Sequence, residues 1–191
     1  MRICIINGHP DPSPQRYAHA LATAYGDGAR EGGHEVRTIT VGMLDFPIVR
    51  TREDFMADYV PPVIREAQNT IRWADHVFLV YPLWHGMLPA YLKAFLEQVF
   101  RRDFAMEVDR SGWTAKLTGR SARIVVTMGM PSLFYRLYFH AHSLHALRQN
   151  ILGFSGMRPV RTTIIGGTEA ASPAELTARL KEMRALGRKG R

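Results

Sequence analysis

The sequence predicts an α/β fold built on a doubly wound, five-stranded parallel sheet with helices on both faces. Two observations lead to this prediction. Five short runs of apolar and β-branched residues alternate with stretches of helical periodicity, which is typical of parallel strands joined by right-handed crossovers. Three of these runs are continuously apolar, as in central strands that are covered on both faces.

The expected strands follow one another at nearly regular intervals along the chain. They lie at Ile3–Asn7, Val36–Val41, Val77–Tyr81, Ile124–Thr127 and Thr162–Ile165. The first, third and fourth runs are the continuously apolar ones and are assigned to the centre. The second contains Arg37 and Thr38 and the fifth contains Thr162 and Thr163, which suits less buried outer positions. The predicted strand order is therefore 2-1-3-4-5.

The expected helices fill the intervals between these strands. They lie at Arg16–Glu31, Pro61–Trp73, Pro89–Arg101, Leu133–Leu152 and Pro173–Leu186. In the first of them, Tyr17, Ala20, Leu21 and Ala24 recur with helical spacing. The connection from Gly42 to Val60 shows no periodicity, and a connection of this length inside a compact domain tends to be functional.

Length and composition are those of one ordinary globular domain, residues 1–191, with a basic C-terminal tail at about 187–191. Hydrophobic residues make up 46% of the chain and charged residues 22%. No stretch approaches the ~20 apolar residues of a membrane span, and the first strand leaves no room for a signal peptide. The single Cys4 is expected to be a small buried hydrophobe. These features favour a cytoplasmic protein with no direct insertion into a membrane.

The net charge of +8 favours an anionic partner. The densest basic run lies at the C-terminus, and no aromatic residues interleave with it, so the sequence predicts no nucleic-acid binding. His140, His142 and His145 raise the question of a metal site. Residues two apart point to different faces of a helix, and no carboxylate or cysteine accompanies them. A helix surface or dimer contact is therefore favoured, and no metal is expected.

The loop after the first strand, Gly8–Arg16, has the features of an anion-binding site. A helix begins directly after it, and a helix N-terminus offers unpaired N–H groups and a partial positive charge. Ser13, Gln15 and Arg16 add side-chain donors. The loop lacks the glycine-lysine ending of NTPases and the G-x-G-x-x-G fingerprint. The alternative is that its polar residues are simple helix caps.

Three strand ends should meet at one edge of this sheet, because ligands collect at the carboxyl ends of the strands. They are followed by Gly8–Arg16, Tyr81–Pro89 and Thr127–Ser132, the last leading into Tyr135. Glycines permit a close backbone approach, and Trp84 and Tyr135 offer stacking surfaces with a polar group. Such walls suit a flat, electron-poor ring. The alternative for the second loop is a buried turn with Trp84 in the core.

These residues resemble a known family. The resemblance rests on three stretches: Gly8-His9-Pro10, the stretch from Tyr81-Pro82-Leu83-Trp84 through Met87-Leu88-Pro89-Ala90-Tyr91-Leu92-Lys93 to Val99-Phe100, and Thr127-Met128-Gly129. They look like the flavodoxin-like NAD(P)H dehydrogenase (quinone) family, of the DT-diaphorase and potassium-efflux ancillary quinone reductase type. The resemblance spans roughly Arg2 to Gly167.

The resemblance implies an enzyme that holds a flavin without a covalent bond, either FMN or FAD. NAD(P)H would reduce the flavin, and a quinone-like acceptor would reoxidise it by two-electron transfer. The family is homodimeric, and the segment Phe134–His145 is expected to contribute to the interface. The alternatives are an electron-carrier flavoprotein and a flavin-binding ancillary subunit associated with a membrane transporter.

The resemblance also implies roles for individual residues. His9, Ser13, Gln15 and Arg16 would surround the phosphate and ribityl chain, Pro82, Leu83, Trp84, His85 and Gly86 would border the isoalloxazine, and Thr127, Met128, Gly129 and Met130 would contact its other edge. Tyr135 would lie at the pyrimidine side, and Tyr135 and His85 are the predicted catalytic residues. The first loop is longer than the family's common form, so the resemblance does not decide which hydroxyl would contact the phosphate. The family's histidine falls at Ala141, between His140 and His142.

Overall fold

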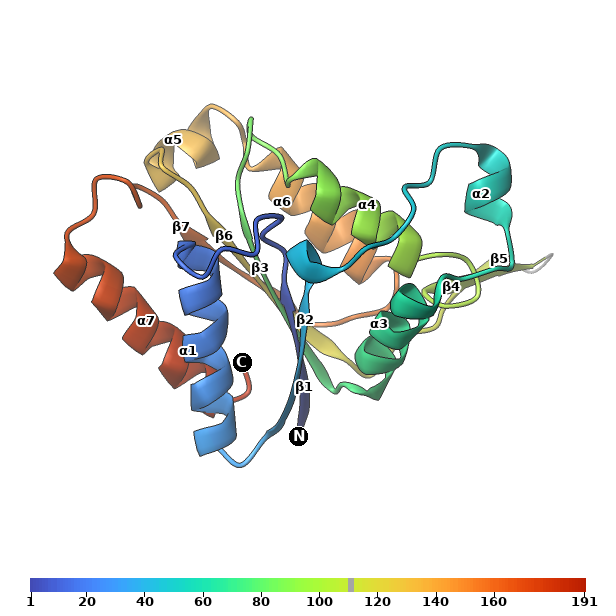
Figure 1. Cartoon of the computed structure of the whole chain (residues 1–191), viewed down its shortest axis with the longest axis horizontal. Helices are drawn as coiled ribbons and strands as arrows, with labels where there is room; N and C mark the ends of the chain where they lie inside the picture. Colours follow the sequence, from blue (N-terminus) through green and yellow to red (C-terminus); the bar gives the residue numbers. More distant parts are fainter. Residues whose placement is uncertain (110–111) are drawn as a thin grey trace.

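The structure, a computed structural model, describes residues 1–109 and 112–191 (Figure 1). Within these residues, five parallel strands form one sheet in the order β2-β1-β3-β6-β7. The strands are β1 (Arg2–Asn7), β2 (Glu35–Thr40), β3 (His76–Pro82), β6 (Ser121–Thr127) and β7 (Val160–Ile165). In chain order these are the five predicted strands, so the predicted topology 2-1-3-4-5 is confirmed.

Helices cover both faces of this sheet, as predicted (Figure 1). The first face carries α1 (Tyr17–Glu31) and α7 (Pro173–Arg188); the second carries α3 (Pro62–Trp73), α4 (Ala90–Val99), α6 (His142–Ala146) and the π-helical segment η2 (Leu147–Gly153). Alternate residues of β1 serve the two faces: Ile3 and Ile5 pack under α1, whereas Cys4 and Ile6 face α4. This two-sided burial explains the continuous apolar runs.

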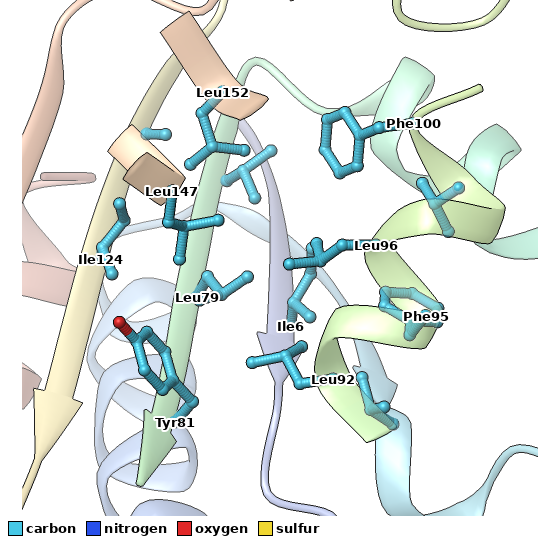
Figure 2. Close-up of a cluster of buried hydrophobic side chains, with 14 of the residues drawn as sticks. Ile6, Leu79, Tyr81, Leu92, Phe95, Leu96, Phe100, Ile124, Leu147 and Leu152 are labelled. Carbon is cyan, nitrogen blue, oxygen red and sulfur yellow. The ribbon is translucent and has the colours of Figure 1, made fainter. Parts of the chain in front are cut away.

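The core on the α4 side joins three central strands to two helices (Figure 2). Ile6 lies beside Leu92 of α4, Ile124 lies beside Leu147 of η2, and Leu79 lies between these two pairs. Each of these five side chains is fully buried, and burial of one such side chain contributes about 1.5–3 kcal/mol. This core fixes α4 and the central strands relative to each other, and so fixes the loops at their carboxyl ends.

On the other face, α1 and α7 approach each other so closely that only glycine fits. A Cβ atom on Gly28 would lie 1.9 Å from the carbonyl oxygen of Arg184, and one on Gly187 would lie 2.0 Å from that of Tyr25. The Glu31 carboxylate also accepts hydrogen bonds from Arg184 and Arg188. The chain is therefore helical through Arg188, and the start of the expected basic tail is the last turn of α7.

The predicted helix Leu133–Leu152 was wrong as a single element. The chain forms α5 (Ser132–Leu137), then a break, then α6 and η2. His140 and Ala141 lie in the break with φ values of 48° and 49°, a left-handed conformation that no right-handed helix contains. The apolar spacing of this segment continues across the break, so periodicity alone did not reveal it.

Four short elements were not predicted at all: one helix, one 3₁₀ turn and a pair of strands. The helix α2 (Arg52–Met56) lies within the connection 42–60 and begins with a capping box between Thr51 and Asp54. It buries none of its residues, which explains the missing periodicity. The strands β4 (Met106–Asp109) and β5 (Gly112–Ala115) form an antiparallel pair between α4 and β6. The connection also contains the 3₁₀ turn η1 (Val41–Met43).

Side chains of α4, and of Arg101 two residues after its end, hold the long connection in place. The Tyr91 hydroxyl donates to the carbonyl of Leu44, and the Gln98 amide donates to that of Pro47. The buried Arg101 guanidinium donates to the carbonyls of Tyr59 and Ala57, at 3.0 Å and 3.3 Å. The connection is therefore attached along its length. Across the described ranges, the structure contains no helix long and apolar enough to cross a membrane.

Candidate functional site

The loops that follow β1, β3 and β6 lie side by side at the carboxyl edge of the sheet, as the strand order requires. Backbone hydrogen bonds tie the start of each of the first two loops to the neighbouring strand: the Gly8 N–H donates to the carbonyl of Val80 in β3 at 2.8 Å, and the Leu83 N–H donates to that of Thr127 in β6 at 2.7 Å. Gly8 also lies against Leu92, where a Cβ atom would be 2.8 Å from the nearest side-chain carbon. The three loops therefore start next to one another.

A hydrogen-bond network fixes the first loop. The His9 N–H donates to Asn7 Oδ1 at 3.3 Å, and the Asp11 N–H donates to His9 Nδ1 at 3.0 Å. His19, on α1, contacts the Asp11 carbonyl through Nε2 at 2.9 Å. Burial lowers the pKa of His9, which favours its neutral form. Because its Nδ1 accepts a hydrogen bond, the neutral ring carries its proton on Nε2. The His9 ring lies edge-on to the Trp84 ring, with the two ring centroids 6.0 Å apart.

The second half of this loop gathers donors at the start of α1. The Asp11 carboxylate accepts from the Ser13 N–H at 2.8 Å and from Arg16 Nε at 2.6 Å. These two contacts, the backbone one first, lower the pKa of Asp11. Ser13 Oγ donates to the side-chain oxygen of Gln15, and Arg16 precedes α1 without a side-chain cap. Helix amides, a hydroxyl and a guanidinium therefore lie together, as an anion site requires.

The second loop reverses the chain in a tight turn that presents an indole ring. Trp84 and Met87 exchange two backbone hydrogen bonds of 2.9 Å. His85 and Gly86 between them have φ values of 49° and 75°, as in a two-residue hairpin turn of type I′. The Trp84 side chain is 47% exposed, so it lies outside the core, contrary to the alternative of a buried turn. His85 is exposed on the same turn, whereas Pro82 is half-buried and Leu83 is buried.

The third loop combines buried and open positions. Thr127 and Met128 are buried, Gly129 is exposed and Met130 is half-buried. A Cβ atom on Gly129 would lie 2.7 Å from the Glu169 carboxylate. This carboxylate is the far end of a flexible side chain, so a small side chain at position 129 would require only that Glu169 move aside.

Sequence reasoning missed the segment that follows β7 at this same edge. The Gly167 N–H donates to the carbonyl of Met130 at 2.9 Å, and the Thr168 N–H donates to that of Met128 at 3.1 Å. A cavity of about 410 Å³ lies between this segment and Leu176 and Arg179 of α7. The available signal was Gly166-Gly167-Thr168, directly after the fifth predicted strand.

Tyr135 occupies a different position from the one expected of a catalytic group. Its side chain is fully buried, and its hydroxyl is 2.9 Å from Ser143 Oγ. Its role in catalysis stays a prediction, and its burial favours support of the third loop from behind. The neighbouring residues of α5 face outward instead. We call the exposed side chains of Leu133, Phe134, Leu137 and Tyr138 the α5 patch.

Three histidines, His140, His142 and His145, lie near the break between α5 and α6. The rings of His140 and His142 lie 5.4 Å apart. No group of three or more His, Cys, Asp or Glu side chains that could hold a metal ion occurs in residues 1–109 and 112–191.

The substitution Tyr135→Phe is expected to lower stability by about 1–2 kcal/mol, because it leaves the buried Ser143 hydroxyl without its partner. The ring is kept, so flavin reduction and reoxidation should proceed at unchanged rates. Thermal unfolding and the two half-reactions, each followed by flavin absorbance, check this. A fall of about 10²–10³ in either rate, with flavin still bound, would instead support the catalytic role predicted from the sequence.

Comparison with known proteins adds one family and several relatives. A family described as having a flavodoxin-like fold matches residues 1–186. An uncharacterized NAD(P)H oxidoreductase of Haemophilus influenzae is 25% identical over 170 residues, which cover 87% of this chain and 84% of that protein. The NAD(P)H:quinone oxidoreductase from Methanothermobacter marburgensis superposes with a TM-score of 0.84 at 21% identity, over 98% of both chains. An FMN-dependent NADH-azoreductase from Bacillus anthracis, in complex with FMN, superposes with a TM-score of 0.76 at 16% identity, also over 98% of both chains. The two solved structures share the fold.

Proposed function

Since the chain belongs to the family with the flavodoxin-like fold, we propose that residues 1–191 act as one domain, a flavin-dependent NAD(P)H:quinone oxidoreductase. The observation that carries this proposal is that the three loops start next to one another, with an exposed Trp84 beside the donor-rich start of α1. An anion site next to an aromatic wall suits a phosphorylated ring cofactor. The names of the Haemophilus and Methanothermobacter proteins agree with this reading.

FMN is the proposed cofactor. His9, Ser13, Gln15 and Arg16 would hold its phosphate and ribityl chain, because they surround the one position where helix amides and a guanidinium meet. The resident FMN of the Bacillus azoreductase supports this choice over FAD. When bound, the flavin supplies the hydride and electron chemistry, whereas the protein supplies position and electrostatics.

The other two loops would enclose the ring. Trp84 offers a flat apolar surface, and His85 and Gly86 bring the backbone close to it in the tight turn. Pro82 and Leu83 would complete this side, and Thr127, Met128, Gly129 and Met130 would form the opposite edge. His85, exposed at the mouth of the site, is proposed to donate a hydrogen bond to the acceptor. NAD(P)H and the quinone would take the open face in turn.

The α5 patch supports a homodimer. Its four apolar side chains are exposed next to one another, and the rings of Phe134 and Tyr138 stack at 5.0 Å. Contiguous exposed apolar surface of this kind marks interaction sites. Because α5 directly follows the third loop, a partner bound here would lie next to the proposed flavin site.

Purified protein is expected to contain one FMN per chain. The flavin spectrum before and after denaturation gives the stoichiometry, and the mass of the released cofactor separates FMN from FAD. Anaerobic NADPH should then bleach the spectrum in one two-electron step, and a benzoquinone should restore it. A colourless protein that takes up neither flavin would refute the proposal, and a stable one-electron product would favour an electron carrier instead.

A further inference from the structure

The Asp11 carboxylate lies in the middle of the proposed phosphate loop, although a negative charge there ought to oppose a phosphate. It is bound to Arg16 Nε at 2.6 Å and to the Ser13 N–H at 2.8 Å. An ion pair this exposed contributes little to the stability of the fold. Stability of the fold is therefore a weak reason for its presence.

The backbone of Asp11 is itself fixed on both sides. Its N–H donates to His9 Nδ1, and its carbonyl accepts from His19 Nε2. Pro10 and Pro12 flank it, and each restricts φ to about −65°. The carboxylate is thus presented from a rigid part of the loop, toward a guanidinium at the end of a long and half-exposed side chain.

Asp11 contacts Arg16 through Nε only. Within the part of the chain that the structure describes, no hydrogen bond or ion pair involves the two terminal nitrogens of Arg16. These nitrogens form the planar fork that binds phosphate oxygens in pairs. A free arginine side chain loses rotamer entropy when it is fixed in one orientation. An anchor at Nε removes part of this cost before a ligand arrives.

We propose that Asp11 is a positioning residue that orients Arg16 toward the cofactor phosphate. This inference rests on the proposed function. It makes Asp11 favourable for FMN binding in spite of its charge, and it confines that effect to ligands that carry a phosphate.

The test is Asp11→Asn, because an asparagine oxygen still accepts from the Ser13 N–H while the charge on Arg16's partner is lost. FMN and riboflavin are titrated into the full chain freed of flavin, with fluorescence as the readout. The dissociation constant for FMN should rise by about three- to tenfold, and that for riboflavin should stay the same. In an Arg16→Ala background, Asp11→Asn should have no further effect. Asp27→Asn is the matched control, since Asp27 pairs with Arg30 farther along α1.

Four results would overturn the inference. Tighter FMN binding by Asp11→Asn would show that the carboxylate competes with the phosphate. An equal loss for riboflavin would show a purely structural role. Independent, multiplicative effects of the two substitutions would show that Asp11 does not act through Arg16. If the unaltered protein binds neither flavin, the proposed function itself has failed; unchanged FMN binding by Asp11→Asn overturns only the positioning role.

Discussion

Arg16→Ala is expected to weaken FMN binding by about ten- to hundredfold. In the proposed function Arg16 donates a charge-assisted hydrogen bond to the phosphate, and the loss of such a bond costs about 1.5–3 kcal/mol; Arg16 stands where the loop after β1 meets the start of α1. Fluorescence titration with FMN measures the effect, and riboflavin, which lacks the phosphate, should bind as before.

Arg30→Ala is the matched control, since Arg30 is an exposed arginine in the last turn of the same helix. It removes the same charge from the chain without touching the loop. If Arg16→Ala and Arg30→Ala bind FMN equally well, Arg16 points to solvent, and Ser13 with the backbone amides holds the phosphate.

Gly28→Ala is expected to destabilise the fold by about 3 kcal/mol. The added Cβ would lie 1.9 Å from a backbone oxygen of α7, and neither helix can yield without losing its contact with the sheet. In a chain of this size the melting temperature should fall by roughly 6–12 °C, at about 2–4 °C per kcal/mol.

Gly26→Ala, two residues earlier on α1, provides the comparison. Its Cβ would meet only the ends of the Ile5 and Arg30 side chains, at 3.1 Å and 3.4 Å. Alanine also gains about 0.5–1 kcal/mol over glycine within a helix, so this variant should be nearly neutral. Equal melting temperatures for the two variants would contradict a backbone contact between α1 and α7.

The architecture could be predicted because burial on two faces leaves a strong signal. Strands β1, β3 and β6 are apolar at successive positions, and their order then decides which loops meet. The elements that escaped prediction have no such signal. Helix α2 buries nothing, and the break before α6 depends on two residues with positive φ that spacing does not encode.

The candidate site shows the same division between what depends on topology and what depends on packing. The three loops could be located because strand ends on one edge must be neighbours. The direction of a side chain could not: Trp84 and Tyr135 are both aromatic residues close to the ends of strands, yet one is exposed and the other is buried against Ser143. Packing partners far along the chain decide this difference.

The attachment of the long connection to α4 also bears on how a ligand would enter. Ordering one residue of a loose segment costs roughly 1–2 kcal/mol in backbone entropy. The bonds from Tyr91, Gln98 and Arg101 order the span between Leu44 and Tyr59 while the chain folds. A ligand that contacts this span would therefore meet a segment that is already ordered and would not bear this entropic cost.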